Sequence, residues 1–182
     1  MNRIDLNSRR QEIIALAEQL FNEITSLPPE IRPDEKPRTG IAVLVIDPND
    51  QNNMLYFTIG EPSERARYLA VKKAVSSFIY SDVSSKNKEN PLYLDFPGSL
   101  TFIDEGVGDF DIWTCQASVS GLKGEEDVAI STMILADIFQ LTPRDVLINI
   151  KKNFGQLPKE FSQEGHYLRK ILKLESRRAQ LE

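Results

Sequence analysis

Residues 113–139 read WTCQASVSGLKGEEDVAISTMILADIF, and this stretch decides the fold class. Apolar and polar residues alternate from Ile112 to Val119, which is the two-residue period of a half-buried strand. Gly121 then interrupts the period. The acidic residues that follow lie where the first turn of a helix exposes unpaired N–H groups: Glu125, Glu126 and Asp127. The stretch therefore predicts a strand, a tight turn and a helix.

The predicted helix 128–139 carries apolar residues around nearly its whole circumference. These residues are Val128, Ile130, Met133, Ile134, Leu135, Ile138 and Phe139. A helix of this kind cannot lie on a surface with one side in water. We therefore expect further protein to cover both sides of it.

Hydrophobic periodicity and turn residues predict the other elements. In chain order they are a helix 8–26 with Ser8 and Gln11 as a capping box, strands 41–46 and 54–59, a helix capped by Ser63, a weak strand 93–96, strands 99–104 and 110–119, the helix ending at 139, a short helix 142–153 and a basic helix from about 162. The hairpin 41–59 and the short, turn-separated strands indicate an α+β domain.

The totals describe an ordinary folded chain. It has 182 residues, of which 41% are apolar, so a sizeable core needs neither metal nor disulfide. The single cysteine, Cys115, is expected to be a buried apolar residue, and its isolation indicates a reducing compartment. No apolar run approaches the roughly 20 residues needed to span a bilayer, and no signal segment precedes the first helix. We predict a cytoplasmic protein that does not bind membranes.

Charge is unevenly distributed along the chain. The net charge is −5, but residues 151–182 carry +4 and residues 1–150 carry −9. An acidic body argues against nucleic-acid binding, which needs a contiguous positive surface. The basic helix from about 162 has three interpretations: a solvated face, an arm that docks on a neighbouring subunit, or an element that binds an acidic partner. Docking in a homo-oligomer is favoured, because it would also cover helix 128–139.

Catalytic motifs are absent from the sequence. One His and one Cys are too few for a zinc or non-haem iron site, and Ser118–Gly121 lacks the first glycine of an esterase elbow. No glycine-rich phosphate loop occurs. We therefore predict no catalytic residue and no metal site. His166 is most simply an exposed helix residue, with haem ligation as the alternative.

Two groups remain as candidates for ligand binding. The carboxylates of Glu125, Glu126 and Asp127 could bind a cation or act as acid and base, although the simpler interpretation is a solvated cluster that compensates the helix dipole. Lys73 lies at the border of the apolar stripe of its helix. There it would either meet an anionic ligand or extend its ammonium group into water.

Three blocks of sequence resemble the GlcG/HbpS-like family, also called the haem-degrading domain family. Residues 42–47 (AVLVID) resemble the family's valine-rich strand, residues 70–74 (AVKKA) its Lys-Ala helix, and residues 119–127 (VSGLKGEED) its Val-Ser-Gly, Glu-x-Asp corner. The resemblance covers about residues 8–140. It implies a first domain, 1–141, followed by a basic helical extension, 142–182.

The resemblance implies a profilin-like fold, in which an antiparallel sheet carries helices on both faces, and it implies oligomers. Some members bind haem or related tetrapyrroles through histidines inside the domain, whereas the only histidine here is His166. We therefore expect a non-catalytic or weakly catalytic cytoplasmic oligomer that holds a tetrapyrrole-like or anionic ligand between the Ser63 helix and the sheet. The residues expected to line or orient the ligand are Lys73, Ser120, Gly121, Glu125, Glu126 and Asp127. The alternative is a scaffold or adaptor that binds a protein partner through the C-terminal helices.

Overall fold

The computed structural model describes residues 4–33, 37–83, 99–104, 113–154 and 167–171. The elements in these ranges are α1 (Arg10–Thr25), β1 (Gly40–Asp47), β2 (Asp50–Gly60), α2 (Glu64–Val83), β3 (Ser99–Asp104), β4 (Trp113–Ser120), α4 (Gly124–Phe139), α5 (Pro143–Phe154) and α7 (Tyr167–Ile171). The chain is an α+β domain, as its sequence predicts. The strands form one antiparallel sheet in the order β2-β1-β4-β3.

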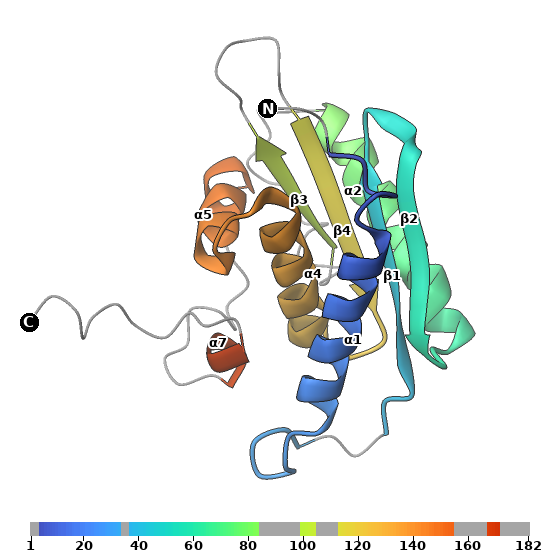
Figure 1. The fold of residues 1–182 in the computed structure, drawn as a ribbon, viewed down its shortest axis with the longest axis vertical. Helices are drawn as coiled ribbons and strands as arrows, with labels where there is room; N and C mark the ends of the chain where they lie inside the picture. Colours follow the sequence, from blue (N-terminus) through green and yellow to red (C-terminus); the bar gives the residue numbers. More distant parts are fainter. Residues whose placement is uncertain (1–3, 34–36, 84–98, 105–112, 155–166, 172–182) are drawn as a thin grey trace, which may run out of the picture.

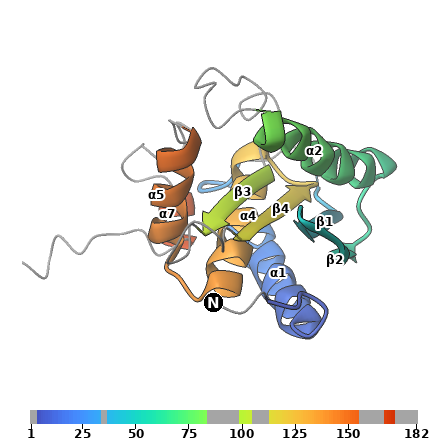
Figure 2. The same ribbon diagram turned by 90° about the horizontal axis from the view of Figure 1, so that it is seen from above.

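Helices cover both faces of the sheet. Helix α2 lies on one face, and α1 and α4 lie on the other (Figures 1 and 2). Helix α5 lies beside β3 and α4. Alternate residues of β1 face the two layers: Val43 and its odd-numbered neighbours join the core of α1 and α4, while Ala42 and Leu44 are buried beneath α2. The continuous apolar run of this strand thus reflects burial on both sides.

Strand β4 is buried more completely than its alternation predicts. Its polar residues Gln116, Ser118 and Ser120 are all buried, so the expectation of a half-buried strand is wrong. The reason is the small-residue face of α2, formed by Ala66, Ala70 and Ala74. This face allows a close approach, in which the Ser118 hydroxyl donates a 2.7 Å hydrogen bond to the Ala70 carbonyl. The Ser118 side chain fits here because the helix backbone itself supplies an acceptor.

Helix α4 is the central helix of the domain. It packs against β4 and β3 and against α1, α5 and α7 of the same chain. Ile130 and Ile134 are wholly buried, and Met133 is partly buried. The cover expected around this helix is therefore present within one chain, and it needs no neighbouring subunit. Helix α5 contributes Val146, Leu147 and Ile150 to the same core cluster.

Most element boundaries agree with the sequence to within a few residues, and the predicted caps at Ser63 and Thr142 are present. The capping box predicted at Ser8 is wrong, because α1 begins after Arg9 and the Ser8 hydroxyl donates to the Asp5 carbonyl. The strand predicted at 93–96 and most of the last helix lie outside the described residues. Among the described helices, none is both long and apolar enough to cross a membrane.

Candidate functional site

The turn between β4 and α4 is the centre of the candidate site. Its conformation depends on Gly121, whose φ of 142° is one that side chains rarely adopt. A Cβ atom at this position would lie 2.4 Å from the carbonyl oxygen of Gly40 at the start of β1. The turn therefore lies directly against the neighbouring strand, which a glycine alone permits.

Asp127, in the first turn of α4, organises the turn from within. One carboxylate oxygen accepts a 3.0 Å hydrogen bond from the Leu122 N–H, and the other lies 3.4 Å from Lys73 Nζ. Lys73 Nζ also donates a 3.0 Å hydrogen bond to the Val119 carbonyl. The carboxylate thus binds both the chain that enters α4 and a cation from another helix.

Lys73 reaches Asp127 from the opposite side of the sheet. It belongs to α2, whereas Asp127 belongs to α4 on the other face. Strand β3 begins at Ser99, which pairs with Ser118, so β4 extends beyond it at Val119. The Lys73 side chain reaches the other face of the sheet beside Val119, where β4 is not paired with β3. The pair therefore links the two helical layers around the end of β3.

Burial shifts the pKa of both partners. It raises the pKa of Asp127 to about 7, an effect that nearby Lys73 and the Leu122 N–H oppose. Burial also lowers the pKa of Lys73, against the opposing effect of Asp127. Desolvation is the largest cause for both groups. The pair is an internal structural contact, and both side chains are at most 6% exposed.

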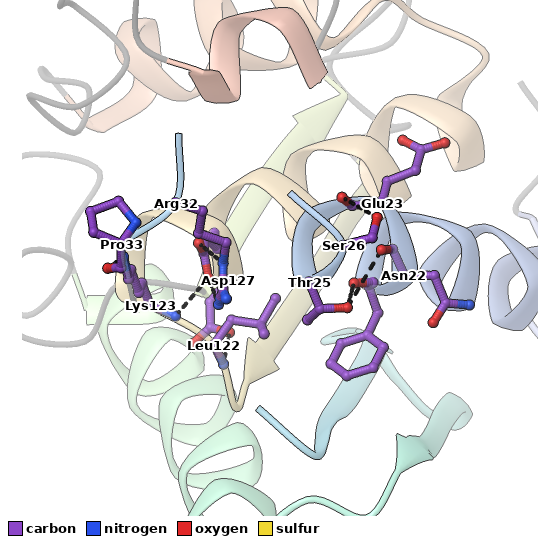
Figure 3. Close-up of polar contacts among 11 residues, drawn as sticks. Asn22, Glu23, Thr25, Ser26, Arg32, Pro33, Leu122, Lys123 and Asp127 are labelled. Atoms are coloured by element: carbon purple, nitrogen blue, oxygen red, sulfur yellow. Dashed lines mark hydrogen bonds and ion pairs between the residues drawn. The ribbon is translucent and has the colours of Figure 1, made fainter. Parts of the chain in front are cut away.

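A second buried ion pair lies beside the first. Arg32 Nε donates to one Glu126 carboxylate oxygen at 2.7 Å, and Nη2 donates to the other at 2.9 Å. The second oxygen also accepts a 3.1 Å hydrogen bond from the Lys123 N–H, and Lys123 Nζ donates to the Pro33 carbonyl at 2.7 Å. Figure 3 shows the segment with Arg32 and Pro33 against the start of α4. These contacts fasten the connector that follows α1.

The solvated interpretation of the acidic cluster is therefore wrong for two of its three members. Glu126 and Asp127 are buried, and only Glu125 is partly exposed. The sequence could not show this, because both counter-ions are distant along the chain. Arg32 lies in a connector of mixed charge that carries no periodic pattern, so sequence reasoning missed it. Lys73 was identified, but its partner is a carboxylate of the same chain.

A small pocket lies between the start of α2 and the sheet. It has a volume of about 140 Å³ and is lined by Pro37, Arg38, Thr39, Gly40, Ser63, Ala66 and Gly121. Arg38 supplies positive charge, and the pocket adjoins the N-terminal end of α2, which favours negative charge. Of the predicted site residues, Gly121 lines this pocket, while Lys73, Glu126 and Asp127 lie behind the turn that carries it.

Within the described residues, no three His, Cys, Asp or Glu side chains gather closely enough to hold a metal ion. His166, the alternative haem ligand, lies outside them. Cys115 is fully buried, and burial raises the pKa of its thiol. The thiol is thus the apolar core residue that its strand position predicts.

The chain was compared with family models, with curated proteins and with solved structures, and none of the three comparisons gives a match.

Proposed function

We propose that this chain is a small-molecule-binding protein of the GlcG/HbpS-like type, and that its ligand places an anionic group in the pocket beside Gly121. One observation carries the proposal: the pocket lies between the Ser63 helix and the sheet, where the resemblance leads us to expect the ligand. Arg38 gives it a cation, and the Ser63 hydroxyl, which accepts the Ala66 N–H, has its own proton to donate. The Thr39 hydroxyl also lines the pocket, but it donates to the Glu61 carbonyl. Such a donor set suits a carboxylate or a phosphate.

The size of the pocket limits what can enter it. Its volume of about 140 Å³ is below the roughly 300–1,000 Å³ of pockets that enclose drug-sized ligands. A carboxylate or phosphate group fits, but a complete tetrapyrrole does not. A haem-like ligand would therefore insert one propionate and leave its ring system outside.

The buried ion pairs would support this pocket by fixing the conformation of the turn that contains Gly121. Asp127 holds the Leu122 N–H, and Glu126 holds the Lys123 N–H, so the turn that carries Gly121 is bound on its inner side. A turn held in this way keeps its shape before a ligand arrives. Pre-organisation of this kind raises affinity, because less entropy is lost on binding.

Titration with defined anions tests the proposal. We expect inorganic phosphate or acetate to shift the backbone amide NMR signals of Thr39, Gly40 and Gly121 in a saturable manner. Arg38→Ala should weaken binding at least several-fold, whereas Arg10→Ala, an exposed arginine on α1, should leave it unchanged. Equal binding by both variants, or no saturable shift, would remove the pocket as a ligand site. A parallel haemin titration, read at the Soret band, tests the tetrapyrrole version.

The adaptor hypothesis keeps one supporting observation. Helix α5 presents Ile148, which is 54% exposed, together with exposed Lys151 and Lys152. Removing residues 142–182 would not test this hypothesis cleanly, because Val146 and Ile150 belong to the core. The sharper test is Ile148→Lys in the full chain. Loss of a co-purifying protein with unchanged thermal stability would favour the adaptor.

A further inference from the structure

The two edges of the sheet differ in what covers them. At the β3 edge, the Asn149 side chain of α5 accepts a hydrogen bond from the Ile103 N–H and donates one to the Ile103 carbonyl. A helix thus covers the strand. At the opposite edge, no described strand or helix lies beyond β2 in the sheet, although α1 packs against one of its faces (Figure 1). The two edges therefore differ in whether a further strand can pair with them.

Most of β2 lacks the usual protection of an edge strand. Natural edge strands carry charged residues, prolines or bulges that prevent pairing with another chain. Strand β2 begins with the charged Asp50, and its pairing with β1 is irregular there, because Asp47 pairs with Asp50 while the adjacent Ile46 pairs with Met54. The seven residues 54–60, MLYFTIG, pair regularly with β1 and contain neither a charge nor a proline. This part of the edge is suited to pairing with another strand.

An apolar surface accompanies this edge. On the α2 side of the sheet, Met54 is 44% exposed and Tyr56 is 38% exposed. Tyr56 pairs with Leu44 of β1, which is buried, so α2 covers β1 and leaves β2 open. On this face of β2, the large side chains of Met54 and Tyr56 are therefore exposed, because no described helix packs over them.

The flank of α2 extends this surface. Lys73 points toward the β3 side of the helix, because it reaches Val119 beyond the end of β3. At about 100° per residue, Val71 lies roughly 160° around the helix from Lys73 and therefore on the flank nearer β2. Val71 is 42% exposed. Together with Met54 and Tyr56 it forms what we term the β2-edge surface.

We infer that β2 pairs antiparallel with β2 of a second copy of this chain, about a two-fold axis, and joins the two sheets into one. A two-fold axis places each strand against its own copy, so the uncharged residues 54–60 meet no like charge. The apolar β2-edge surface then meets itself. Seven residues of a strand are about 24 Å long, and the edge together with the flanking helix is about 20 Å across. The interface would thus bury about 1,000 Å² in total, which is near the lower limit for a specific interface.

Sedimentation of the full chain tests this pairing. We expect the wild-type protein to sediment as a dimer that dissociates on dilution. The double variant Met54→Lys/Tyr56→Lys should raise the dissociation constant at least tenfold, because two pairs of like charges would face each other. The matched control is Ile148→Lys, which adds a charge at an exposed apolar residue of α5 and should leave the dimer unchanged. A wild-type monomer at every concentration, or a dimer that survives both lysines, would overturn the inference.

Hydrogen exchange supplies a readout that needs no variant. Alternate amides of β2 point away from β1, and these should exchange slowly in the concentrated wild-type protein and rapidly after dilution. The control is β3, whose edge is covered by α5 within one chain and should show no dependence on concentration. Protection of β2 that does not change on dilution would count against the pairing. This measurement remains decisive even if the double variant fails to fold.

Discussion

Lys73 and Asp127 belong to helices on opposite faces of the sheet, yet their charged groups lie 3.4 Å apart. The pair makes folding of the two helical layers interdependent, because either charge alone would be buried without its counter-ion. Burying an ionised group without a partner costs several kcal/mol. The contact thus couples α2 to α4 across a sheet that otherwise separates them.

This pair predicts how stability depends on pH. The pKa of Asp127 rises from 3.8 to about 7 on folding, so between these values the folded chain retains a proton that the unfolded chain has released. Its stabilising contribution is therefore complete below pH 3.8 and is lost as the pH rises through about 7. The lowered pKa of Lys73 acts in the opposite direction, at pH values between its folded pKa and 10.5.

Urea denaturation at several pH values measures this dependence. The reference is Lys73→Met/Asp127→Asn, which has neither titrating group. Relative to that reference, the free energy of unfolding of the wild type should fall by a few kcal/mol between pH 4 and pH 7. A constant difference over this range would show that Asp127 titrates normally in the folded chain.

Arg32→Ala should destabilise the chain by about 3–5 kcal/mol, because it leaves the wholly buried carboxylate of Glu126 without its bidentate partner. Arg32→Lys should not restore stability, since an ammonium group cannot make both hydrogen bonds. Chemical denaturation at neutral pH measures the loss, with Arg10→Ala as the exposed control. If Arg32→Ala costs less than about 1 kcal/mol, the pair does not hold the connector.

Gly121→Ala should destabilise the chain by at least about 1–3 kcal/mol, since the new Cβ would meet the Gly40 carbonyl and the positive φ would be strained. Gly124→Ala is the matched control: it makes the same change in the first residue of α4 and should be neutral or stabilising. Thermal denaturation compares the two. Equal melting temperatures would mean that the turn relaxes without strain.

Asn149→Ala should cost about 1–2 kcal/mol, because the backbone N–H and carbonyl of Ile103 lose their side-chain partner. Ile148→Ala, at the adjacent exposed position, should change stability little. Hydrogen exchange should also show faster opening at the Ile103 amide in Asn149→Ala alone. Unchanged exchange there would indicate that water replaces the asparagine.

The sequence predicted the elements well and their polar contacts poorly. The continuous apolar run 41–46 and the apolar helix ending at 139 were located correctly, because apolar patterns record which sides of an element are buried. They do not show which side chain of another element contacts a given polar residue. Glu126 and Asp127 therefore looked like surface carboxylates, since a helix start explains them equally well when they are solvated.

Sequence reasoning found one side of the candidate pocket and missed the other. Gly121 and the Ser63 cap were recognised as a turn and a helix start. Arg38 and Thr39 were not, because they lie in a connector rich in proline and mixed charge. Only the pairing of β1 with both β2 and β4 brings that connector beside Gly121. Long-range register of this kind has no local signature.

The position of β4 also bears on synthesis of the chain. Strand β1 pairs with β2, which follows it directly, and with β4, which is made much later. During translation the first hairpin therefore emerges from the ribosome before β4 has been made. The edge of β1 that later pairs with β4 is then unpaired. We expect chaperones to shield this edge of the nascent chain until α4 has been released and β4 can pair with β1.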